Sequence, residues 1–153
     1  MRTRKTAPDT PYRLDPVLDF MRLLWSVEHG LQRRSKRMES DLGVTGPQRL
    51  VLRVVGRFPG LTAGELAHIV RLHPSTITGI VQRLVTRDLL DRTRDPDDSR
   101  RTRLRLKRRA RAFIKTSSGT IERAVVRALR SAGPLDVRAA RRVLAAVAQN
   151  LDR

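Results

Sequence analysis

The fold is decided by a short stretch of the sequence, Pro74-Ser75-Thr76-Ile77-Thr78-Gly79-Ile80-Val81-Gln82-Arg83-Leu84. Proline is favourable in the first turn of a helix and unfavourable later, so we expect a helix from Pro74 to about Arg87. Its apolar residues recur at helical spacing and share one side, namely Ile77, Ile80, Val81 and Leu84. The opposite side is small and polar and consists of Ser75, Gly79, Gln82 and Thr86, with Thr78 and Arg83 flanking it.

The polar side of this helix has the composition of a surface that reads duplex DNA. Small residues let a helix backbone enter the major groove, and Ser, Thr, Gln and Arg side chains bond base edges or phosphates. Glutamine with adenine and arginine with guanine are the geometrically favoured pairs. The plainer interpretation is an ordinary solvated face, so the neighbouring segments have to decide between the two.

Two further helices precede this one, and capping boxes mark where each begins. Thr45 and Gln48 have the Ser/Thr-x-x-Glu/Gln spacing that satisfies free amides at a helix start, and Phe58-Pro59-Gly60 ends that helix. Thr62 and Glu65 repeat the spacing and open a shorter helix. The residues expected on its inward side are Leu66, Ile69 and Val70. A short helix and a turn therefore lead directly into the helix at Pro74.

After residue 89 the apolar spacing changes from nearly four residues to two, which predicts a two-stranded hairpin. A turn separates the strands and reads Asp95-Pro96-Asp97-Asp98-Ser99-Arg100-Arg101. Arg100 and Arg101 lie at its tip, where a narrow minor groove would attract guanidinium groups, and Asp98 could hold an arginine in a fixed rotamer. A Mg²⁺ or Ca²⁺ loop is a weak alternative, because no glutamate follows at EF-hand spacing and the arginines would repel a cation.

The flanking segments predict helices whose apolar sides have no partner in the centre of the chain. We expect a basic disordered arm (1–12), one long dimerisation helix (13–42), a winged helix-turn-helix DNA-binding domain (45–106) and C-terminal dimerisation helices (107–153). Residues 107 to about 132 have helical spacing, and Ser117-Ser118-Gly119 either kinks or breaks that helix before Gly133-Pro134 ends it. The side chains expected inward there are Ala110, Phe113, Ile114, Ile121, Val125 and Ala128. The predicted fold is mainly α with a small β-wing, and the terminal helices are expected to intertwine in a two-fold dimer.

The composition favours a polyanionic partner. Lysine and arginine total 33 against 15 acidic residues, a formal charge of +18, although a generally basic protein would show the same excess. Aromatic residues make up only 3% of the chain, which argues against stacking on single strands and favours duplex DNA. The absence of cysteine excludes disulfides, thiolate metal sites and cysteine nucleophiles. No apolar run has the length of a signal-peptide core or a membrane span, so we expect a cytoplasmic, nucleoid-associated protein without a membrane partner.

Over roughly residues 14–151 the chain resembles the MarR family of winged helix-turn-helix transcriptional regulators. The most specific match is Asp95-Pro96-x-Asp98-x-Arg100-Arg101 followed by x-x-Leu104-x-Leu106, and the segment from Pro74 to Leu84 matches the family's recognition helix. The resemblance implies a homodimer, built from the first, fifth and sixth helices, that binds a pseudo-palindromic operator in double-stranded DNA. It also implies a small phenolic or aromatic effector that binds between the dimer and DNA-reading regions and weakens DNA binding. The DNA-binding residues that we predict are Ser75, Thr76, Thr78, Gly79, Gln82, Arg83, Arg100 and Arg101.

The chain departs from the family pattern at three places around the wing. Lys107 and Ala110 stand where the family usually has Thr and Gly, so the threonine cap between the wing and the next helix is missing. Ser99 makes the wing one residue longer, which leaves open which of the two tip arginines enters the groove. The run Lys107-Arg108-Arg109, with Arg111, adds charge that could bind phosphates.

Candidate ligand and catalytic residues are few. Trp25 and His29 lie one helical turn apart and could stack on and hydrogen-bond an aromatic acid, although packing at the dimer interface is the simpler interpretation. Glu28 fits an interface salt bridge better than acid–base catalysis. No two histidines share a helix at a spacing of four, so we expect no metal site. Because no P-loop, GxGxxG, nucleophile or paired-carboxylate motif appears, we also expect no cofactor and no enzymatic activity.

Three functions from different classes follow from these patterns. The leading one is a dimeric, sequence-specific transcriptional regulator, a repressor relieved by a small aromatic ligand. The alternative is an architectural or nucleoid protein that coats DNA without sequence preference, which the charge of +18 would allow. The third is an enzyme or small-molecule carrier with an incidental basic surface, against which the organised wing argues.

Overall fold

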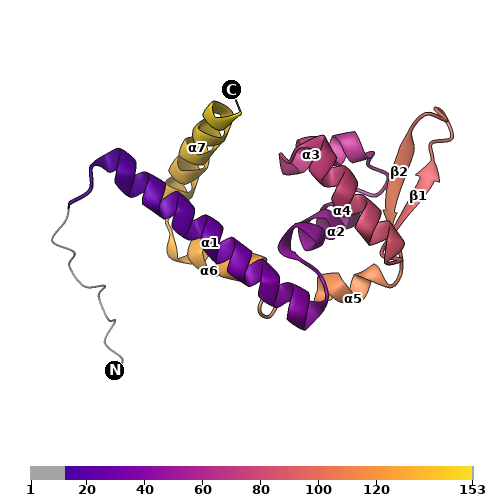
Figure 1. The fold of residues 1–153 in the computed structure, drawn as a ribbon, viewed down its shortest axis with the longest axis horizontal. Coiled ribbons are helices and arrows are strands. Elements are labelled where there is room, and N and C mark those ends of the chain that lie inside the picture. The colour runs from indigo at the N-terminus through magenta and orange to yellow at the C-terminus, as the bar shows by residue number, and fades with distance from the viewer. Residues whose placement is uncertain (1–12, 153) are drawn as a thin grey trace.

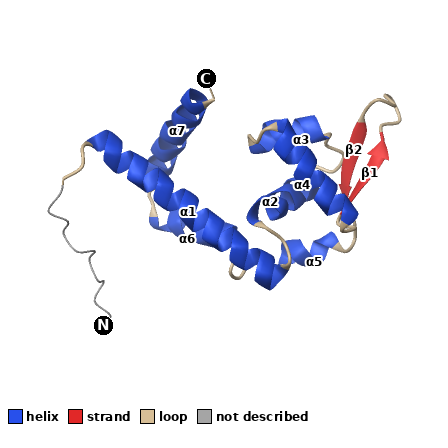
Figure 2. Ribbon diagram, in the orientation of Figure 1, coloured by secondary structure: helices blue, strands red, loops and turns tan. Residues whose placement is uncertain are grey.

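The computed structural model describes residues 13–152, so the basic arm predicted for residues 1–12 lies outside the described part of the chain. As predicted, the fold is mainly helical and carries one small antiparallel hairpin (Figure 1, Figure 2). The elements in chain order are α1 (Pro16–Leu42), α2 (Gly46–Arg57), α3 (Ala63–Val70), α4 (Pro74–Thr86), β1 (Leu90–Arg94), β2 (Thr102–Leu106), α5 (Ala110–Lys115), α6 (Ile121–Ser131) and α7 (Pro134–Leu151). We call α2 to β2 the winged module.

Local sequence explains the ends of the first three helices. The Asp15 carboxylate accepts hydrogen bonds from the first amides of α1, and Gly43 ends that helix with a positive φ of 74°, which favours glycine. Both predicted capping boxes are present, at Thr45 with Gln48 and at Thr62 with Glu65. The single long first helix and the two capped starts are thus confirmed.

The prediction that Ile69 faces inward was wrong. Leu66 and Ala67 are the buried residues of α3, whereas the side chain of Ile69 is 45% exposed. On the helical wheel, the inward side of α3 is centred between Leu66, Ala67 and Val70. Ile69 lies at the margin of that side and is therefore partly exposed.

The helix at Pro74 and the hairpin form as predicted. α4 buries Ile77, Ile80, Val81 and Leu84, and β1 pairs with β2 so that Leu90 lies opposite Leu106 and Arg94 opposite Thr102. One pairing was not predicted: the amide of Gly60 donates to the Leu104 carbonyl at 2.9 Å, and the amide of Leu104 donates to the Leu61 carbonyl at 2.8 Å. The loop before α3 therefore fixes the wing against the rest of the module.

The segment from residue 107 to 132 is broken into two helices rather than kinked. Gly119 has a positive φ of 72°, and the Thr120 hydroxyl accepts a hydrogen bond from the Arg123 amide at the start of α6. Arg109, which precedes α5, makes no side-chain cap, as the missing threonine led us to expect. Two residues expected inward, Val125 and Ala128, are exposed, because no other element of the described chain covers that side of α6.

Buried apolar side chains are concentrated in the winged module and its immediate neighbours, between Val44 and Ala110. The remaining helices contribute little to this core, since α1 has one buried residue, Met38, and α6 and α7 have none. α1 runs across the molecule beside α6, and the winged module lies next to the C-terminal end of α1 (Figure 1). Among residues 13–152, no helix has the length and apolarity required to cross a bilayer.

Candidate nucleic-acid interface

The outward side of α4 presents the polar residues that the sequence indicated. Ser75, Thr76, Thr78, Gln82 and Arg83 are exposed, and Gly79 is half-buried. A Cβ atom added to Gly79 would meet nothing within 4 Å, so the helix backbone itself is open to approach there. The start of α4 is organised by His73, whose Nδ1 accepts from the Ser75 amide at 3.3 Å and lies 2.7 Å from the Ser75 hydroxyl oxygen.

One polar side chain of α4 is bonded by the wing. The Arg92 guanidinium of β1 donates to the Gln82 amide oxygen at 3.1 Å. Because the amide oxygen of Gln82 is bonded by Arg92, the NH₂ group points away from the arginine and can donate two hydrogen bonds. Sequence patterns did not reveal the contact, because the two residues are brought together only by the path of β1 past α4.

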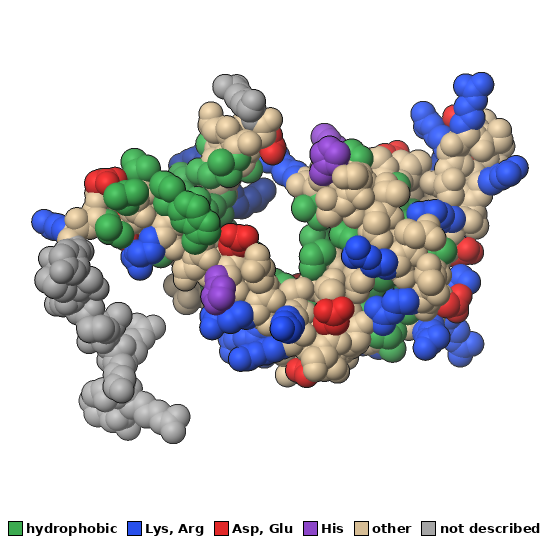
Figure 3. Space-filling view, in the orientation of Figure 1, with side chains coloured by type: hydrophobic (Ala, Val, Ile, Leu, Met, Phe, Trp, Pro, Cys, Tyr) green, Lys and Arg blue, Asp and Glu red, His purple; other side chains and the backbone are tan. Residues whose placement is uncertain are grey.

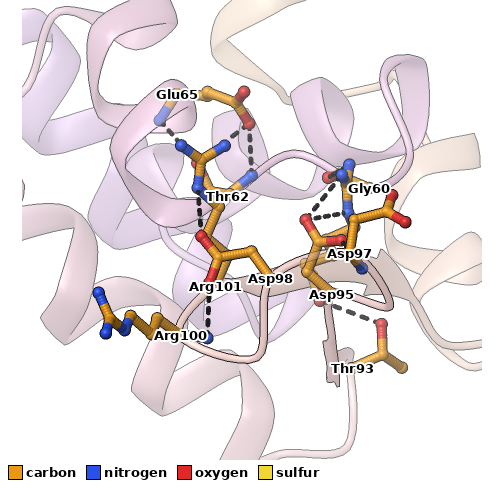
Figure 4. Close-up of polar contacts among 10 residues, drawn as sticks. Gly60, Thr62, Glu65, Thr93, Asp95, Asp97, Asp98, Arg100 and Arg101 are labelled. Carbon is orange, nitrogen blue, oxygen red and sulfur yellow. Dashed lines mark hydrogen bonds and ion pairs between the residues drawn. The ribbon is translucent and has the colours of Figure 1, made fainter.

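The wing tip holds one of its two arginines and leaves the other free. Asp98 accepts from the backbone amide of Arg100 at 3.0 Å, and its second oxygen lies 3.4 Å from Nε of Arg101. The guanidinium of Arg100 has no hydrogen-bond or ion-pair partner within residues 13–152. Figure 4 shows these residues around the turn. The expected carboxylate–arginine contact is thus made with Arg101, whose side chain is still 64% exposed.

Asp95 anchors the base of the turn. Its side chain is buried, accepts from the Asp97 amide at 3.0 Å and is bonded by the guanidinium of Arg103 at 2.7 and 2.8 Å. Arg103 also donates to the Gly60 carbonyl at 3.3 Å, which joins the wing to the loop before α3. The Asp97 amide, together with Arg103, lowers the pKa of Asp95 although desolvation raises it. Turn propensity alone accounts for an aspartate at this position of the sequence, so the buried contacts of Asp95 were not predicted.

The start of α3 lies beside the wing tip. Thr62, Glu65, Arg100 and Arg101 line one hollow of about 470 Å³. Hydrogen bonds from the Thr62 amide and hydroxyl lower the pKa of Glu65, and the charges of Arg103 and Arg101 lower it further. Arg101 at the tip and Arg103 in β2 therefore act by their charge on a carboxylate that stays ionised at this end of the module.

The additional basic run lies at the other end of the hairpin. Lys107 follows β2 at the base of the wing, where its amide donates to the Leu89 carbonyl and its Nζ lies 2.5 Å from an Asp88 carboxylate oxygen. The hydrogen bond to Asp88 and the charge of that carboxylate raise the pKa of Lys107. Arg108 and Arg109 border the same hollow as Asp88 and Lys107.

An apolar groove of about 880 Å³ runs between α1 and α7. Its walls are formed by Pro16, Val17, Phe20, Met21, Leu24, Trp25, Glu28, Val143, Leu144, Val147, Ala148 and Leu151. Green side chains cover this region in the space-filling view (Figure 3). Trp25 is 59% exposed in it, whereas His29 is not among its lining residues. Glu28 accepts a hydrogen bond from Gln32 at 3.0 Å within α1.

A second groove, of about 530 Å³, lies where α1, the start of α6 and the winged module meet. It is lined by Leu31, Gln32, Ser35, Lys36, Glu39, Gly46, Pro47, Leu50, Leu72, Ile121 and Glu122. Neither Trp25 nor His29 belongs to it. In the described part of the chain, no three histidine or carboxylate side chains come together as metal ligands would.

Comparison with known proteins relates these features to a family. A family model described as "MarR family" matches residues 42–101. YsmB of Bacillus subtilis (strain 168), described as an uncharacterized HTH-type transcriptional regulator, is 27% identical over 93 residues. That alignment covers 61% of this chain and 64% of YsmB, so the chain spans less than two thirds of that relative's length.

Solved structures resemble most of the chain. The PcaV transcriptional regulator from Streptomyces coelicolor, solved in complex with its natural ligand, is 28% identical with a TM-score of 0.72, and the match covers 90% of this chain and 97% of PcaV. The S. aureus MepR–DNA complex shares the fold at 14% identity, with a TM-score of 0.71 over 86% of this chain and 97% of MepR. Together with the capped helices, the polar face of α4 and the arginine-tipped hairpin, these matches show that residues 42–101 match the MarR family and that the chain has the fold of MarR-family winged helix-turn-helix transcriptional regulators.

Proposed function

We propose that the protein is a dimeric, sequence-specific DNA-binding regulator of transcription, a repressor that a small aromatic molecule releases from its operator. One observation carries the proposal: the polar side of α4 and the arginine tip of the wing are both exposed and belong to one module, whose elements share a hydrophobic core. A helix in the major groove and an arginine in the adjacent minor groove would then engage the same duplex.

Within this proposal the exposed residues have different tasks. Gln82 and Ser75 read base edges, with Thr76, Thr78 and Arg83 beside them, and Gly79 lets the backbone approach the bases. At the tip, Arg100 enters the minor groove because it has no protein partner, while Asp98 keeps Arg101 in place against the phosphates. Reading by α4 supplies sequence discrimination, and the arginines add affinity that depends on salt.

A second copy of the chain covers the groove between α1 and α7. Leu144, Val147 and Trp25 contribute to a continuous apolar surface there, of the kind that isologous dimers bury. A two-fold dimer presents two recognition helices, which accounts for a pseudo-palindromic operator. Trp25 belongs to this interface in the proposal, and His29, one turn further along α1, lies at its edge.

The effector binds in the groove between α1 and the winged module. Its walls are mostly apolar, with Leu31, Leu50, Leu72 and Ile121 among them, and its volume of about 530 Å³ suits a small aromatic molecule. Because the groove lies between two parts of the chain, a bound molecule would favour one placement of the module over another. The ligand complex of the similar PcaV is in keeping with this role.

The test compares operator DNA with a scrambled duplex of equal length and composition. The operator is one recovered from random duplex DNA by the wild-type protein. Gln82→Ala or Ser75→Ala should lose roughly 1–3 kcal/mol of discrimination, because a bonded base edge is left unread. Arg109→Ala, which removes a charge at the base of the wing, should change both affinities alike. Equal losses on the two duplexes for the α4 variants would contradict the assignment of α4 to reading.

The formal charge of +18 also supports a second function, that of an architectural protein that coats DNA without sequence preference. Its binding would depend on salt and duplex length and not on sequence. The same pair of duplexes separates the two functions, since an architectural protein would bind operator and scrambled DNA equally.

A further inference from the structure

The most deeply buried charged side chain in the described chain lies away from the DNA-reading surface. Arg49, in the first turns of α2, is 1% exposed. Its guanidinium donates to the carbonyls of Phe113, Ile114 and Thr116, at 3.1 Å for Ile114 and 2.5 Å for Thr116, and its Nε donates to Glu122 at 2.7 Å. One side chain of the winged module therefore bonds the end of α5 and the start of α6.

These contacts satisfy both partners chemically. The last carbonyls of a helix have no partner within the helix, and a cation is favourable there because of the helix dipole. A buried guanidinium, in turn, is tolerated only when its donors are bonded and its charge is paired. Burial raises the pKa of Glu122, but hydrogen bonds from its own amide and from Arg49 outweigh that effect and lower it overall, so the pair is ionised.

The loop between α5 and α6 is also held from α1. Arg34 donates to the Gly119 carbonyl at 3.4 Å, and the Ser35 hydroxyl accepts from the Gly46 amide at 2.8 Å. The winged module is joined to the other helices by two segments, residues 43–45 and the chain through α5 to residue 120. Side-chain hydrogen bonds thus fix both connections where the chain direction changes, and Arg49 makes most of those at the second.

We propose that Arg49 is a positioning residue that sets the distance and angle between the two DNA-reading modules of the dimer. This inference rests on the dimeric operator binding proposed above. Each additional base pair between half-sites moves them about 3.4 Å apart and rotates one by roughly 35°. A module held at one angle tolerates few spacings, whereas a module that pivots at the α5–α6 break tolerates several, because both halves can still bind together.

The experiment measures affinity for a series of duplexes that carry two copies of one selected half-site, with centres about 8 to 12 base pairs apart. The wild-type protein should prefer one spacing and lose roughly tenfold for each single-base-pair change. Arg49→Met should still dimerise and should lose less than about threefold across neighbouring spacings. Arg49→Lys keeps the charge but not the fork of donors, so its loss of affinity at neighbouring spacings should lie between those of the wild-type protein and Arg49→Met.

Arg53→Met is the matched control. Arg53 lies one turn further along α2, is about half exposed, and has its Nε 3.6 Å from the same Glu122 oxygen, but bonds none of the α5 carbonyls. Its removal deletes the same charge and should leave the spacing preference sharp. A general loss of stability would lower affinity at every spacing and leave the preference itself unchanged, so it is distinguished from loss of positioning.

The outcomes separate this inference from the proposed function. A wild-type protein that binds two half-sites no more tightly than a single half-site would overturn the dimeric operator binding itself, whereas one that binds two half-sites equally well at every spacing would overturn the positioning role. A sharp preference in both the wild-type protein and Arg49→Met would overturn only the role of Arg49. If Arg49→Met does not fold, Arg49→Lys decides the question, because it keeps the charge beside Glu122 but cannot bond the three carbonyls at the end of α5 together. A broadened preference in that variant supports the inference, and an unchanged one overturns it.

Discussion

Asp95 shows how one buried residue stabilises the wing. Its carboxylate is bonded by the Asp97 amide and by the Arg103 guanidinium, and these bonds require the ionised form. Because its pKa is lowered on folding, the contribution is complete above the unfolded value of about 4 and is lost as the pH falls through the folded pKa. The wing should therefore be equally ordered at pH 7 and pH 5 and loosen only under stronger acid.

Asp95→Asn tests this dependence on pH. Amide hydrogen exchange in β1 and β2 should be faster than in the wild-type protein at pH 7, because the bond to Arg103 loses its charge. The additional loosening below pH 4 should disappear in the variant. Asp97→Asn removes a charge from the same turn but alters no buried contact, so its exchange should follow the wild type. Equal acid loosening with and without Asp95 would show that another group is responsible.

Single residues also mark the limit of prediction from sequence. Helical periodicity correctly assigned the exposed side of α4, since residues within one helix determine which side faces outward. The burial of Arg49 was not predictable in this way, because its partners lie 64 to 73 residues further along the chain. The contact of Arg92 with Gln82 depends on how a strand passes a helix, for which the sequence contains no periodic signal.

At the scale of elements, α4 combines a buried side with an unusually open outer one. Gly79 lies in the middle of this helix, where glycine is unfavourable relative to alanine by about 0.5–1 kcal/mol. Because an added Cβ would meet no atom within 4 Å, nothing in the protein itself requires glycine at this position. The proposed reason for it is close approach of the helix backbone to bases.

Gly79→Ala should therefore change stability and DNA binding in opposite directions. Thermal unfolding should show stabilisation of about 0.5–1 kcal/mol, while operator affinity should fall several-fold. Gly30→Ala is a matched control, since Gly30 also lies within a helix and has no atom within 4 Å of an added Cβ. That variant should be stabilised without losing affinity. Unchanged operator binding by Gly79→Ala would argue that this part of α4 stays clear of the bases.

Elements with strong local signals were predicted well. Two capping boxes, a proline start and a change of spacing from four to two located α2, α3, α4 and the hairpin. The break between α5 and α6 was only one of two readings of Ser117-Ser118-Gly119, since a kink has the same composition. Bonds from Arg49 and Arg34 favour the break, and both come from other helices.

For the whole molecule, the distribution of apolar side chains decides the assembly. The winged module has its own core, whereas α6 and α7 bury no residue completely and α1 buries only Met38. Exposed apolar residues on α1 and α7 include Val17, Leu18, Trp25, Val143 and Leu144. An isolated chain would leave this surface in water, so association is expected to be favourable.

Leu144→Asp should prevent that association. A carboxylate in the α1–α7 groove would be desolvated on dimerisation, which is unfavourable without a partner. Light scattering should then show a monomer, and the emission of Trp25, the only tryptophan, should shift to longer wavelength as it becomes fully hydrated. Ala146→Asp places the same charge outside the groove and should leave the dimer intact. A dimer that survives Leu144→Asp would place the interface elsewhere.

The most direct measurement for the central claim is selection of binding sites by the full-length protein from random duplex DNA at fixed salt. We expect enrichment of a near-palindrome whose half-site centres lie about one helical turn, roughly 10 base pairs, apart, with protection over both halves. Recovery of unrelated sequences, bound with affinities that follow only salt concentration and duplex length, would contradict the account.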